Sequence, residues 1–160
     1  MAAAEPPAQS EPSVKGVMRT DVVSIGPDAT VKDLAHLLAE HHLGGVPVVD
    51  TDGQLVGIVT ESDLVAMDTD LHFPFYIQFL DSFIYLESRK KFEERLRKTV
   101  GAFVKDVMTE DVRTVHPEDT VRQVASLMTE HRINRIPVVD ADNKLVGIVG
   151  RHEVLTAIGL

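Results

Sequence analysis

The chain contains one segment twice: residues 17–64 return as residues 107–154 without a gap. About two positions in five are identical between the two copies. The longest identical stretches are PVVD, at Pro47–Asp50 and Pro137–Asp140, and LVGIV, at Leu55–Val59 and Leu145–Val149. A unit this short rarely buries its own apolar face, so the two copies are expected to pack together and to carry related pairs of clefts.

Composition and charge exclude several classes of protein. The 160 residues are 44% hydrophobic and 5% aromatic, which is typical of a soluble globular protein. The longest apolar runs fall far short of the ~20 residues that cross a bilayer, so no membrane association is expected. The formal net charge of −9 opposes binding to nucleic acid, whose phosphates are held mainly by Lys and Arg.

The sequence has no cysteine, which excludes disulfides, thiolate nucleophiles and cysteine-based zinc sites and fits our prediction of a cytoplasmic location. Residues 1–13 (MAAAEPPAQSEPS) have neither the basic start nor the apolar middle of a signal peptide. Their composition predicts a disordered tail.

Each copy predicts the order strand, helix, strand, strand, helix. Val22–Ile25 and Val112–Val115 are β-rich runs closed by turn signals. Helices are expected to begin at Thr30 and Thr120, whose hydroxyls can accept a free backbone N–H, and Gln123 completes a capping box in the second. Their apolar residues recur at the spacing of one buried stripe. The stripe is Val31, Leu34, Ala35 and Leu38 in the first copy, and Val121, Val124, Ala125 and Met128 in the second.

Gly44 and Asn134 follow these helices, and both residue types tolerate the left-handed backbone that ends a helix. A hairpin with an Asp-rich turn is predicted next, followed by a second helix from about Ser62 and His152. The near-continuous apolar strands imply a small sheet covered by helices. The expected fold class is therefore α/β of the mixed α+β kind, with two tandem β-α-β-β-α units.

This order of elements, with VMT-type openings, hydrophobic-Pro-Val-Val-Asp strands and a GIVTESDL segment, resembles the cystathionine β-synthase (CBS) domain, here as a tandem pair or Bateman module. The resemblance excludes only the tail and a middle insertion, so repeat 1 is placed at residues 14–67 and repeat 2 at residues 101–160. The motifs are jointly specific because they recur twice at one spacing. The resemblance implies a pseudo-two-fold pair that binds adenosine-containing ligands in clefts between the repeats, and that dimerises into a flat disc.

A candidate ligand site begins where the Gly57–Val59 strand turns into a helix. Such a turn aims free N–H groups and the positive end of the helix dipole outward, which suits a phosphate. Thr60 and Ser62 add hydroxyls, and the Asp63 carboxylate can accept bonds from neighbouring ribose hydroxyls. The resemblance implies that Asp63 is the ribose contact. It further implies that the adenine is flanked by Gly45, Val46 and Pro47, and that the pocket is closed by Thr114, Val115 and His116 of the other repeat.

The same residues have a second interpretation. Thr60 and Asp63 also have the spacing of a helix cap, and local spacing alone does not separate a cap from a ligand contact. The two roles are compatible.

In repeat 2 the corresponding residues are Gly150, His152 and Glu153, so a hydroxyl is lost and the carboxylate lies one methylene further out. Arg135 stands where repeat 1 has Gly45. The resemblance implies that a basic residue there holds phosphate, to which a guanidinium fork is well matched. The alternative for Arg135 is a solvated surface charge near a helix end. The set predicted for this degenerate or phosphate-selective site is Arg135, Ile136, Pro137, Arg151, His152 and Glu153, with Ser24 and Ile25 of repeat 1.

Residues 68–100 form an insertion that the repeat does not explain, and all six Phe and both Tyr of the chain lie between Phe73 and Phe103. The apolar spacing predicts a helical insertion, with a charged second helix at Lys90–Lys98. The residues expected to face inward are Ile77, Leu80 and Ile84, with Phe79 and Phe83 beside them, and then Phe92 and Leu96. Aromatic residues at this density must be buried, either over an open flank of their own module or in a dimer or partner interface.

Neither a metal site nor catalysis is expected. His41 and His42 are adjacent on a predicted helix, so they point about 100° apart and make a poor ligand pair. The sequence lacks a Walker-type phosphate loop, a G-x-S-x-G elbow and an H-E-x-x-H motif.

The residues and the resemblance together predict a regulatory homodimer that binds AMP, ADP or ATP and signals to a separate effector protein. No cofactor is required, although magnesium would accompany ATP if ATP is the ligand. The main alternative is a constitutive assembly scaffold with vestigial clefts, whose functional surface is the aromatic insertion. A third interpretation, nucleic-acid binding, is opposed by the acidic charge.

Overall fold

The computed structural model describes residues 10–66, 76–79, 82–85 and 102–160. The chain divides into two compact units that do not follow the order of the sequence. The central unit is Val23–Val112, and the terminal unit joins Met1–Val22 to Arg113–Leu160. The chain therefore passes from one unit to the other twice.

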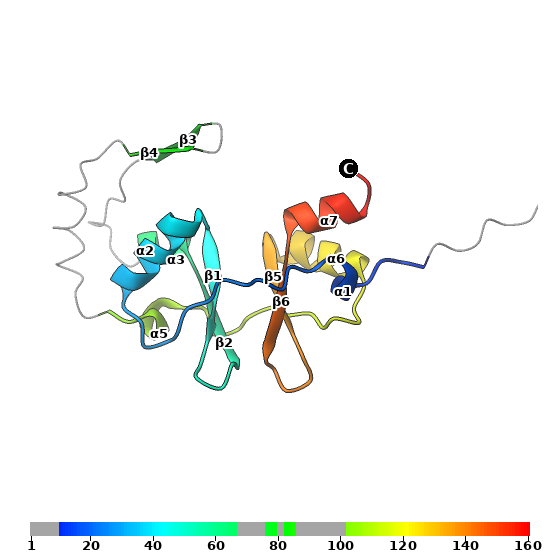
Figure 1. The fold of residues 1–160 in the computed structure, drawn as a ribbon, viewed down its shortest axis with the longest axis horizontal. Helices are drawn as coiled ribbons and strands as arrows, with labels where there is room; N and C mark the ends of the chain where they lie inside the picture. Colours follow the sequence, from blue (N-terminus) through cyan, green and yellow to red (C-terminus); the bar gives the residue numbers. More distant parts are fainter. Residues whose placement is uncertain (1–9, 67–75, 80–81, 86–101) are drawn as a thin grey trace, which may run out of the picture. The chain divides into compact units, whose positions relative to one another are not determined.

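Among the described residues, the two units share one set of elements, namely an antiparallel two-stranded hairpin, two helices and an additional one-turn helix (Figure 1), and the central unit contains a second hairpin, described below. The central unit contains α2 (Val31–His41), β1 (Gly45–Val49), β2 (Leu55–Thr60), α3 (Glu61–Ala66) and α5 (Val104–Val107). The terminal unit contains α6 (Val121–His131), β5 (Arg135–Val139), β6 (Leu145–Gly150), α7 (Arg151–Ala157) and α1 (Val14–Val17). The expected mixed α+β fold with tandem repeats is confirmed.

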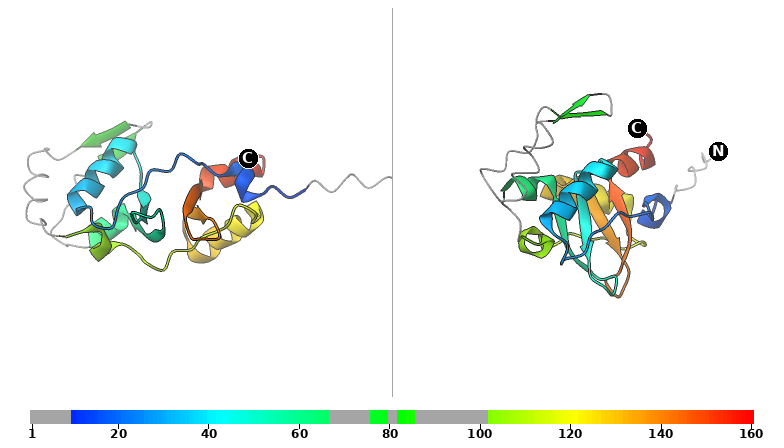
Figure 2. Two further views of the ribbon diagram at one scale, coloured as in Figure 1. Left: turned by 60° about the horizontal axis from the view of Figure 1, so that its bottom comes forward. Right: turned by 60° about the vertical axis from the view of Figure 1, so that its left-hand side comes forward.

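The one-turn helices are exchanged between the repeats. Helix α5 opens repeat 2 but belongs to the central unit, and α1 opens repeat 1 but belongs to the terminal unit, where it lies beside α7 (Figures 1 and 2). Val104 of α5 is completely buried in the core of the central unit, and Val14 of α1 in the core of the terminal unit. Each repeat therefore completes the core of the other with its first helix.

Matching backbone contacts hold the two exchanged helices. The Val104 N–H donates to the carbonyl of Ala29 at 2.8 Å, and the Val14 N–H donates to the carbonyl of Asp119 at 2.8 Å. Beyond each helix, the chain forms one antiparallel bridge with the second strand of the hairpin. The bridged pairs are Thr109 with Ile58 and Arg19 with Ile148.

Two glycines make room for these crossing segments. A Cβ on Gly57 would lie 2.6 Å from the sulfur of Met108 and 3.1 Å from the carbonyl oxygen of Thr109. A Cβ on Gly147 would lie 2.9 Å from the carbonyl oxygen of Arg19, closer than such atoms can approach. The identical LVGIV strands thus contain a glycine because a neighbouring backbone passes over each one.

The predicted helix starts and core stripes are confirmed. The Asp33 N–H donates to the Thr30 hydroxyl at 3.1 Å, and the Thr30 N–H donates back to the Asp33 carboxylate at 3.1 Å. Thr120 and Gln123 form the same reciprocal pair at 3.2 and 2.7 Å. Hydrogen bonds from Thr30, chiefly from its backbone N–H, lower the pKa of Asp33. The stripe of α2 is buried, whereas in α6 its two leading valines are buried and the two later residues are half-buried.

The expected helix ends are wrong by two residues. The left-handed residues are His42 and Arg132, both with φ of 53°, and not Gly44 and Asn134. The following residue turns its N–H back into the helix, as Leu43 does to the carbonyl of Leu38 at 2.9 Å. This bond closes the helix end, and Leu43 packs on the core. The packing of Leu43 therefore fixes the end of the helix at His42, although histidine adopts the left-handed backbone less readily than glycine.

The predicted hairpins are confirmed, and an aspartate organises each turn. Asp50 Oδ1 accepts the N–H groups of Asp52 and Gln54, both at 2.9 Å. Asp140 Oδ1 accepts the equivalent two N–H groups of its own turn. The last residue of the repeated PVVD motif thus has a structural role.

The first strand expected in each repeat is reduced to a single parallel bridge. Ile25 pairs with Val48, and Val115 pairs with Val138. In both repeats the chain enters a new unit within this expected strand, after Val22 and after Val112. Only the last residue of each expected strand, Ile25 or Val115, therefore pairs with a neighbouring strand.

The insertion is not helical where the structure describes it. Strands β3 (Tyr76–Phe79) and β4 (Ser82–Tyr85) form an antiparallel hairpin in which Tyr76 is opposite Tyr85 and Ile77 is opposite Ile84. The helical prediction is therefore wrong for Ile77, Phe79, Phe83 and Ile84. Aromatic and β-branched residues favour strands, and here that preference outweighs the helical spacing. Leu80 and the expected helix at Lys90–Lys98, with Phe92 and Leu96, lie outside the described residues. Among the described residues, none of the helices has the length and apolar character required to cross a membrane.

Candidate functional site at the strand-to-helix junctions

The first junction is the point where β2 ends at Thr60 and α3 begins at Glu61. The Thr60 N–H donates to Asp63 Oδ2 at 2.8 Å, and the Thr60 hydroxyl donates to the same oxygen at 3.0 Å. The Asp63 N–H approaches the Thr60 hydroxyl at 3.4 Å. The capping interaction that the spacing predicts is therefore present, and it fixes the carboxylate in one orientation.

The Asp63 carboxylate keeps one oxygen for another partner. Both bonds from Thr60 end on Oδ2, and within the described part of the chain Oδ1 accepts no hydrogen bond. Asp63 is half-buried, so the group is fixed by its surroundings yet reachable. An oriented carboxylate oxygen of this kind is suited to accept a hydrogen bond from a hydroxyl group.

Most backbone donors at the first junction already have partners. The N–H groups of Thr60 and Asp63 take part in the cap, and the Glu61 N–H donates to the carbonyl of Gly44 at 3.0 Å. Helix α3 has only six residues. The exposed Ser62 therefore adds a hydroxyl, but the predicted row of free N–H groups for a phosphate is largely used by the protein itself.

The central unit brings several further predicted residues next to the first junction. Gly45 is opposite Thr60 in the β1–β2 ladder. The Ile25 N–H donates to the carbonyl of Pro47 at 3.1 Å, so the Ser24–Ile25 segment runs along the same strand. Val46 is buried in the core, which leaves only its backbone for a ligand.

The second junction, where β6 ends at Gly150 and α7 begins, is built differently. The Gly150 N–H donates to Glu153 Oε2 at 2.8 Å. A Cβ on Gly150 would lie 2.8 Å from the same oxygen, so the glutamate folds back into space that the Thr60 side chain requires in repeat 1. The Arg151 guanidinium donates to the side-chain oxygen of Asn134. No side-chain hydroxyl takes part in this cap.

The remaining residues predicted for the second site lie on β5 and beside it. Arg135 is opposite Gly150 in the ladder and is half-buried, whereas Ile136 and Pro137 are buried. His152 is exposed next to Arg151. The second junction is thus basic at the positions where the first has Gly45, Glu61 and Ser62.

His116 is held in a defined orientation at the start of repeat 2. Its Nδ1 lies 2.9 Å from the carbonyl oxygen of Val139, so this nitrogen carries the proton. Its backbone N–H donates to Asp119 at 2.7 Å. The neighbouring Val115 is buried and Thr114 is half-buried.

Two segments of the chain, residues 14–69 and 104–160, match the family model described as "CBS domain". Together they span more than half of the chain. The protein belongs to the CBS domain family. The resemblance carried by the repeated motifs is therefore confirmed.

Related CBS proteins include both short and longer chains. Protein MJ1426 of Methanocaldococcus jannaschii is 32% identical over 154 residues, which are 91% of this chain and 90% of that protein. The chloroplastic CBS domain-containing protein CBSX1 of Arabidopsis thaliana is 33% identical over 147 residues, and the match spans 87% of this chain but 60% of CBSX1. A solved structure of CBSX2 in complex with AMP is 31% identical, covers 91% of this chain and 95% of that chain, and has a TM-score of 0.69.

The predicted CBS ligand sites combine residues from both compact units. The first prediction joins the Thr60–Asp63 junction to Thr114–His116 of the terminal unit, and the second joins Arg135 and its neighbours to Ser24–Ile25 of the central unit. Within each compact unit, the structure places the junction on the same hairpin as the single-bridge segment of its own repeat. This segment contains Ile25 in repeat 1 and Val115 in repeat 2. The combinations across the units remain predictions.

One feature of the junctions escaped the sequence reasoning. The Glu153 carboxylate caps the backbone N–H of Gly150 and lies close to its Cα, where repeat 1 has the Thr60 side chain. Alignment of the two repeats does show this change, because repeat 2 has Gly150 in place of Thr60 and the longer Glu153 in place of Asp63.

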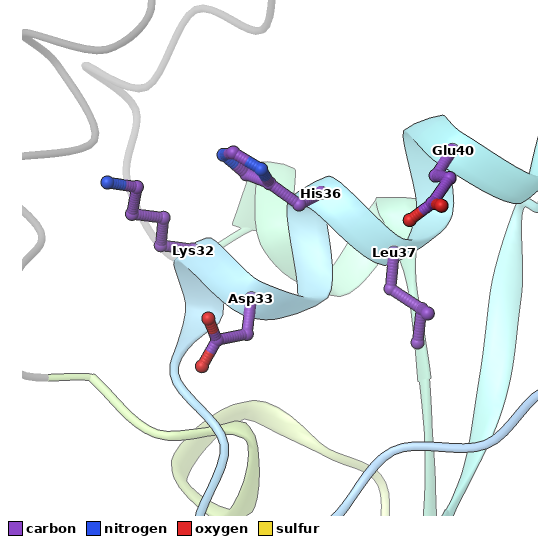
Figure 3. Close-up of a pocket in the computed structure, with 5 residues that line it drawn as sticks. All are labelled: Lys32, Asp33, His36, Leu37 and Glu40. Atoms are coloured by element: carbon purple, nitrogen blue, oxygen red, sulfur yellow. The ribbon is translucent and has the colours of Figure 1, made fainter.

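A surface hollow of about 190 Å³ lies on α2 (Figure 3). It is lined by Lys32, Asp33, His36, Leu37 and Glu40, and it includes no residue predicted for a ligand site. Across the described stretches of the chain, no three His, Asp or Glu side chains gather in a way that could hold a metal ion.

Proposed function

We propose that this CBS protein binds an adenine nucleotide through its first junction and that the bound nucleotide regulates a separate partner protein. The observation that carries the proposal is the Asp63 carboxylate, which Thr60 holds through one oxygen while the other accepts no bond within the described residues. The structure of the 31% identical CBSX2 in complex with AMP supports AMP as the first ligand to test.

In the proposed complex Asp63 accepts a hydrogen bond from a ribose hydroxyl, and Gly45, Val46 and Pro47 lie beside the adenine through their backbone. Ser62 and Thr60 supply hydroxyls at the edge of the site. A nucleotide can switch the protein only if it binds one arrangement of the two units more tightly than another. The signal would then pass to an effector protein, with the CBS protein acting as a homodimer in the cytoplasm.

The proposal requires no resident cofactor and includes no catalytic step. Magnesium enters only as the counterion of ATP, if ATP binds. Arg135, Arg151 and His152 are proposed to contribute positive charge toward phosphate groups.

Isothermal titration calorimetry of the full chain with AMP, ADP and ATP, the last with and without magnesium, tests the proposal. Removal of one hydrogen bond to a charged group costs about 1.5–3 kcal/mol, so Asp63→Asn should weaken AMP binding roughly 10- to 100-fold. Glu153→Gln is the matched control at the second junction and should have a much smaller effect. Loss of binding in the Glu153 variant with no change in the Asp63 variant would reverse the assignment.

A constitutive scaffold is the second candidate function. It is favoured by the β3–β4 hairpin, whose strands YIQF and SFIY contain no charged residue. Titration with AMP, ADP, ATP and S-adenosylmethionine separates the two functions, because a scaffold with vestigial clefts gives no heat with any of them. Light scattering of the intact chain, compared with a chain lacking residues 68–100, then reports whether the insertion joins two copies.

A further inference from the structure

We propose that Met18 and Met108 are sites at which hydrogen peroxide modifies the protein, and that their oxidation loosens the segments that cross the β1–β2 and β5–β6 hairpins. The proposal goes beyond nucleotide binding and does not depend on it. The sequence has five methionines and no cysteine, so no thiol competes for an oxidant. The methionines among the described residues are Met18, Met108 and Met128.

The sulfur atoms of Met18 and Met108 lie against glycines of the hairpins. A Cβ on Gly57 would lie 2.6 Å from the Met108 sulfur, and a Cβ on Gly147 would lie 2.7 Å from the Met18 sulfur. Each methionine also packs on the core of its compact unit. Both residues are half-buried, so a small oxidant can reach their side chains from solvent.

Met108 stands between two backbone anchors of its crossing segment. Its N–H donates to the carbonyl of Val104 at 2.9 Å and closes helix α5. The next residue forms the bridge, in which Ile58 and Thr109 exchange two hydrogen bonds at 3.0 and 2.9 Å. A change in the methionine side chain therefore acts directly between the helix and the bridge.

The segment after α1 is anchored in the same way. The Met18 N–H donates to the carbonyl of Val14 at 2.8 Å. Arg19 and Ile148 then exchange two hydrogen bonds, both at 2.9 Å. Each compact unit thus contains one methionine sulfur at an equivalent place, and the two sites should respond to an oxidant alike.

Oxidation converts the thioether of methionine into a sulfoxide. The sulfur attacks one oxygen of hydrogen peroxide, so an S–O bond forms while the O–O bond breaks. The sulfur gives up two electrons to the peroxide, and the displaced hydroxide takes the proton of the transferred oxygen and leaves as water. The product is a polar, chiral side chain, which methionine sulfoxide reductases convert back to methionine.

The added oxygen disturbs a contact that is already filled. The glycine backbone lies next to the sulfur, and the two N–H groups of the bridge already donate to carbonyls, as at Ile58 and Thr109. The sulfoxide oxygen therefore either lies unpaired against apolar neighbours or takes a donor from the bridge. Both results weaken the crossing segment, because an unpaired polar group and a broken backbone bond are each unfavourable.

Met128 provides the matched control. It is half-buried and packs on the core of the terminal unit, as Met18 does. It lies within helix α6, however, and outside both crossing segments. Replacement of Met128 by leucine should therefore leave the response of both bridges to peroxide unchanged.

The test exposes the full chain to hydrogen peroxide and combines two measurements. Peptide mapping by mass spectrometry gives the fraction of sulfoxide at each methionine, and hydrogen exchange followed by NMR gives the protection of four bridge amides. The four amides are those of Arg19, Ile58, Thr109 and Ile148. Oxidation of Met18 and Met108 in the folded chain should raise exchange at these amides roughly 10- to 100-fold. Treatment with methionine sulfoxide reductases A and B should restore the original rates.

Leucine variants assign each response to its sulfur, since leucine keeps the apolar contact and does not form a sulfoxide. Met108→Leu should abolish the response in the bridge of the central unit and leave it in the bridge of the terminal unit. Met18→Leu should do the reverse. Met128→Leu should respond like the natural chain at both bridges.

Three results would overturn the proposal. The first is that Met18 and Met108 of the folded chain stay reduced in peroxide that oxidises a short methionine-containing peptide. The second is sulfoxide at both positions with unchanged exchange at the bridges. The third is a response that persists in the leucine variant expected to abolish it. The first two results need only the natural chain, so they decide the proposal even where a leucine variant does not fold.

Discussion

The two compact units share a scaffold and differ at one junction. Both use a threonine cap on the long helix, an aspartate in the hairpin turn and a glycine under the crossing segment. They differ at the end of the second strand, where repeat 1 has Thr60 and Asp63 and repeat 2 has Gly150 and Glu153. The caps of the long helices, the turn aspartates and the buried glycines are thus duplicated, whereas the caps at the two strand-to-helix junctions are not. The comparison of the repeats therefore locates their difference at the residues for which we propose ligand contacts.

The largest expected effect tests whether the exchanged helices belong to the units assigned to them. Val104→Asp places a charge in the core of the central unit and should cost at least about 3 kcal/mol, because a buried charge without a partner is strongly destabilising. Hydrogen exchange followed by NMR should show protection lost at Leu34 and Val48, in repeat 1. Val14→Asp should instead remove protection in the terminal unit.

Val65 provides the control, since it is 52% exposed and Val65→Asp should change stability little. Protection lost first within repeat 2 in the Val104 variant would contradict the exchange.

The next effect compares the two glycines under the crossing segments. Overpacking a tight site costs about 1–3 kcal/mol, and Gly147→Ala should cost more than Gly57→Ala. The reason is that the new methyl group meets a backbone oxygen at 2.9 Å in the first case and at 3.1 Å in the second. Urea denaturation measures both. Gly16→Ala is the control, because its nearest neighbour would be 3.9 Å away, and equal losses at all three positions would refute the packing argument.

A smaller and equal effect is expected at the two helix caps. Thr30→Ala and Thr120→Ala each remove a hydroxyl that accepts a backbone N–H, so each should lower the free energy of unfolding by about 1 kcal/mol. Thermal unfolding of the two variants should give similar shifts. The control is Thr156→Ala, because Thr156 is exposed in α7 and caps no helix start. An equal loss of stability in this variant would show that the caps contribute nothing specific.

The smallest expected effect is a difference in pH dependence between the two caps, because α2 is capped by the charged Asp33 and α6 by the neutral Gln123. The pKa of Asp33 is lowered in the folded protein from its ordinary value of 3.8, so the charged cap contributes stability above that value. The contribution is lost as the pH falls through the lowered pKa. Asp33→Gln copies the uncharged Gln123 cap and should flatten the acid side of the stability curve. Unfolding free energies measured from pH 6 down to about pH 2 test this, and identical curves would contradict it.

Local chemistry was enough to predict much of this structure from the sequence. The stripe from Val31 to Leu38, the caps at Thr30 and Thr120 and the hairpin turns depend on neighbours close in the chain, and all three are observed. The ends of α2 and α6 were misplaced because the apolar contact of Leu43 outweighs residue type. The insertion was misassigned because residues such as Ile77 and Ile84 satisfy a helical spacing and a strand pairing equally well.

The exchange of first helices lay beyond such reasoning. The openings at Val17–Met18 and Val107–Met108 are nearly identical, so nothing in either segment indicates which hairpin it crosses. At the candidate site, the cap at Thr60 and Asp63 followed from local spacing. The contact between Gly150 and the Glu153 carboxylate was not predicted, because Gly150 lacks the hydroxyl that marks the cap at Thr60.

The exchanged helices also constrain how a chain of this kind can be shortened or extended during evolution. Deleting one whole copy would remove the helix that closes the other, and adding a third would leave its opening segment without a hairpin to cross. The two repeats must therefore be kept or lost together, even though the sequence consists of two similar copies.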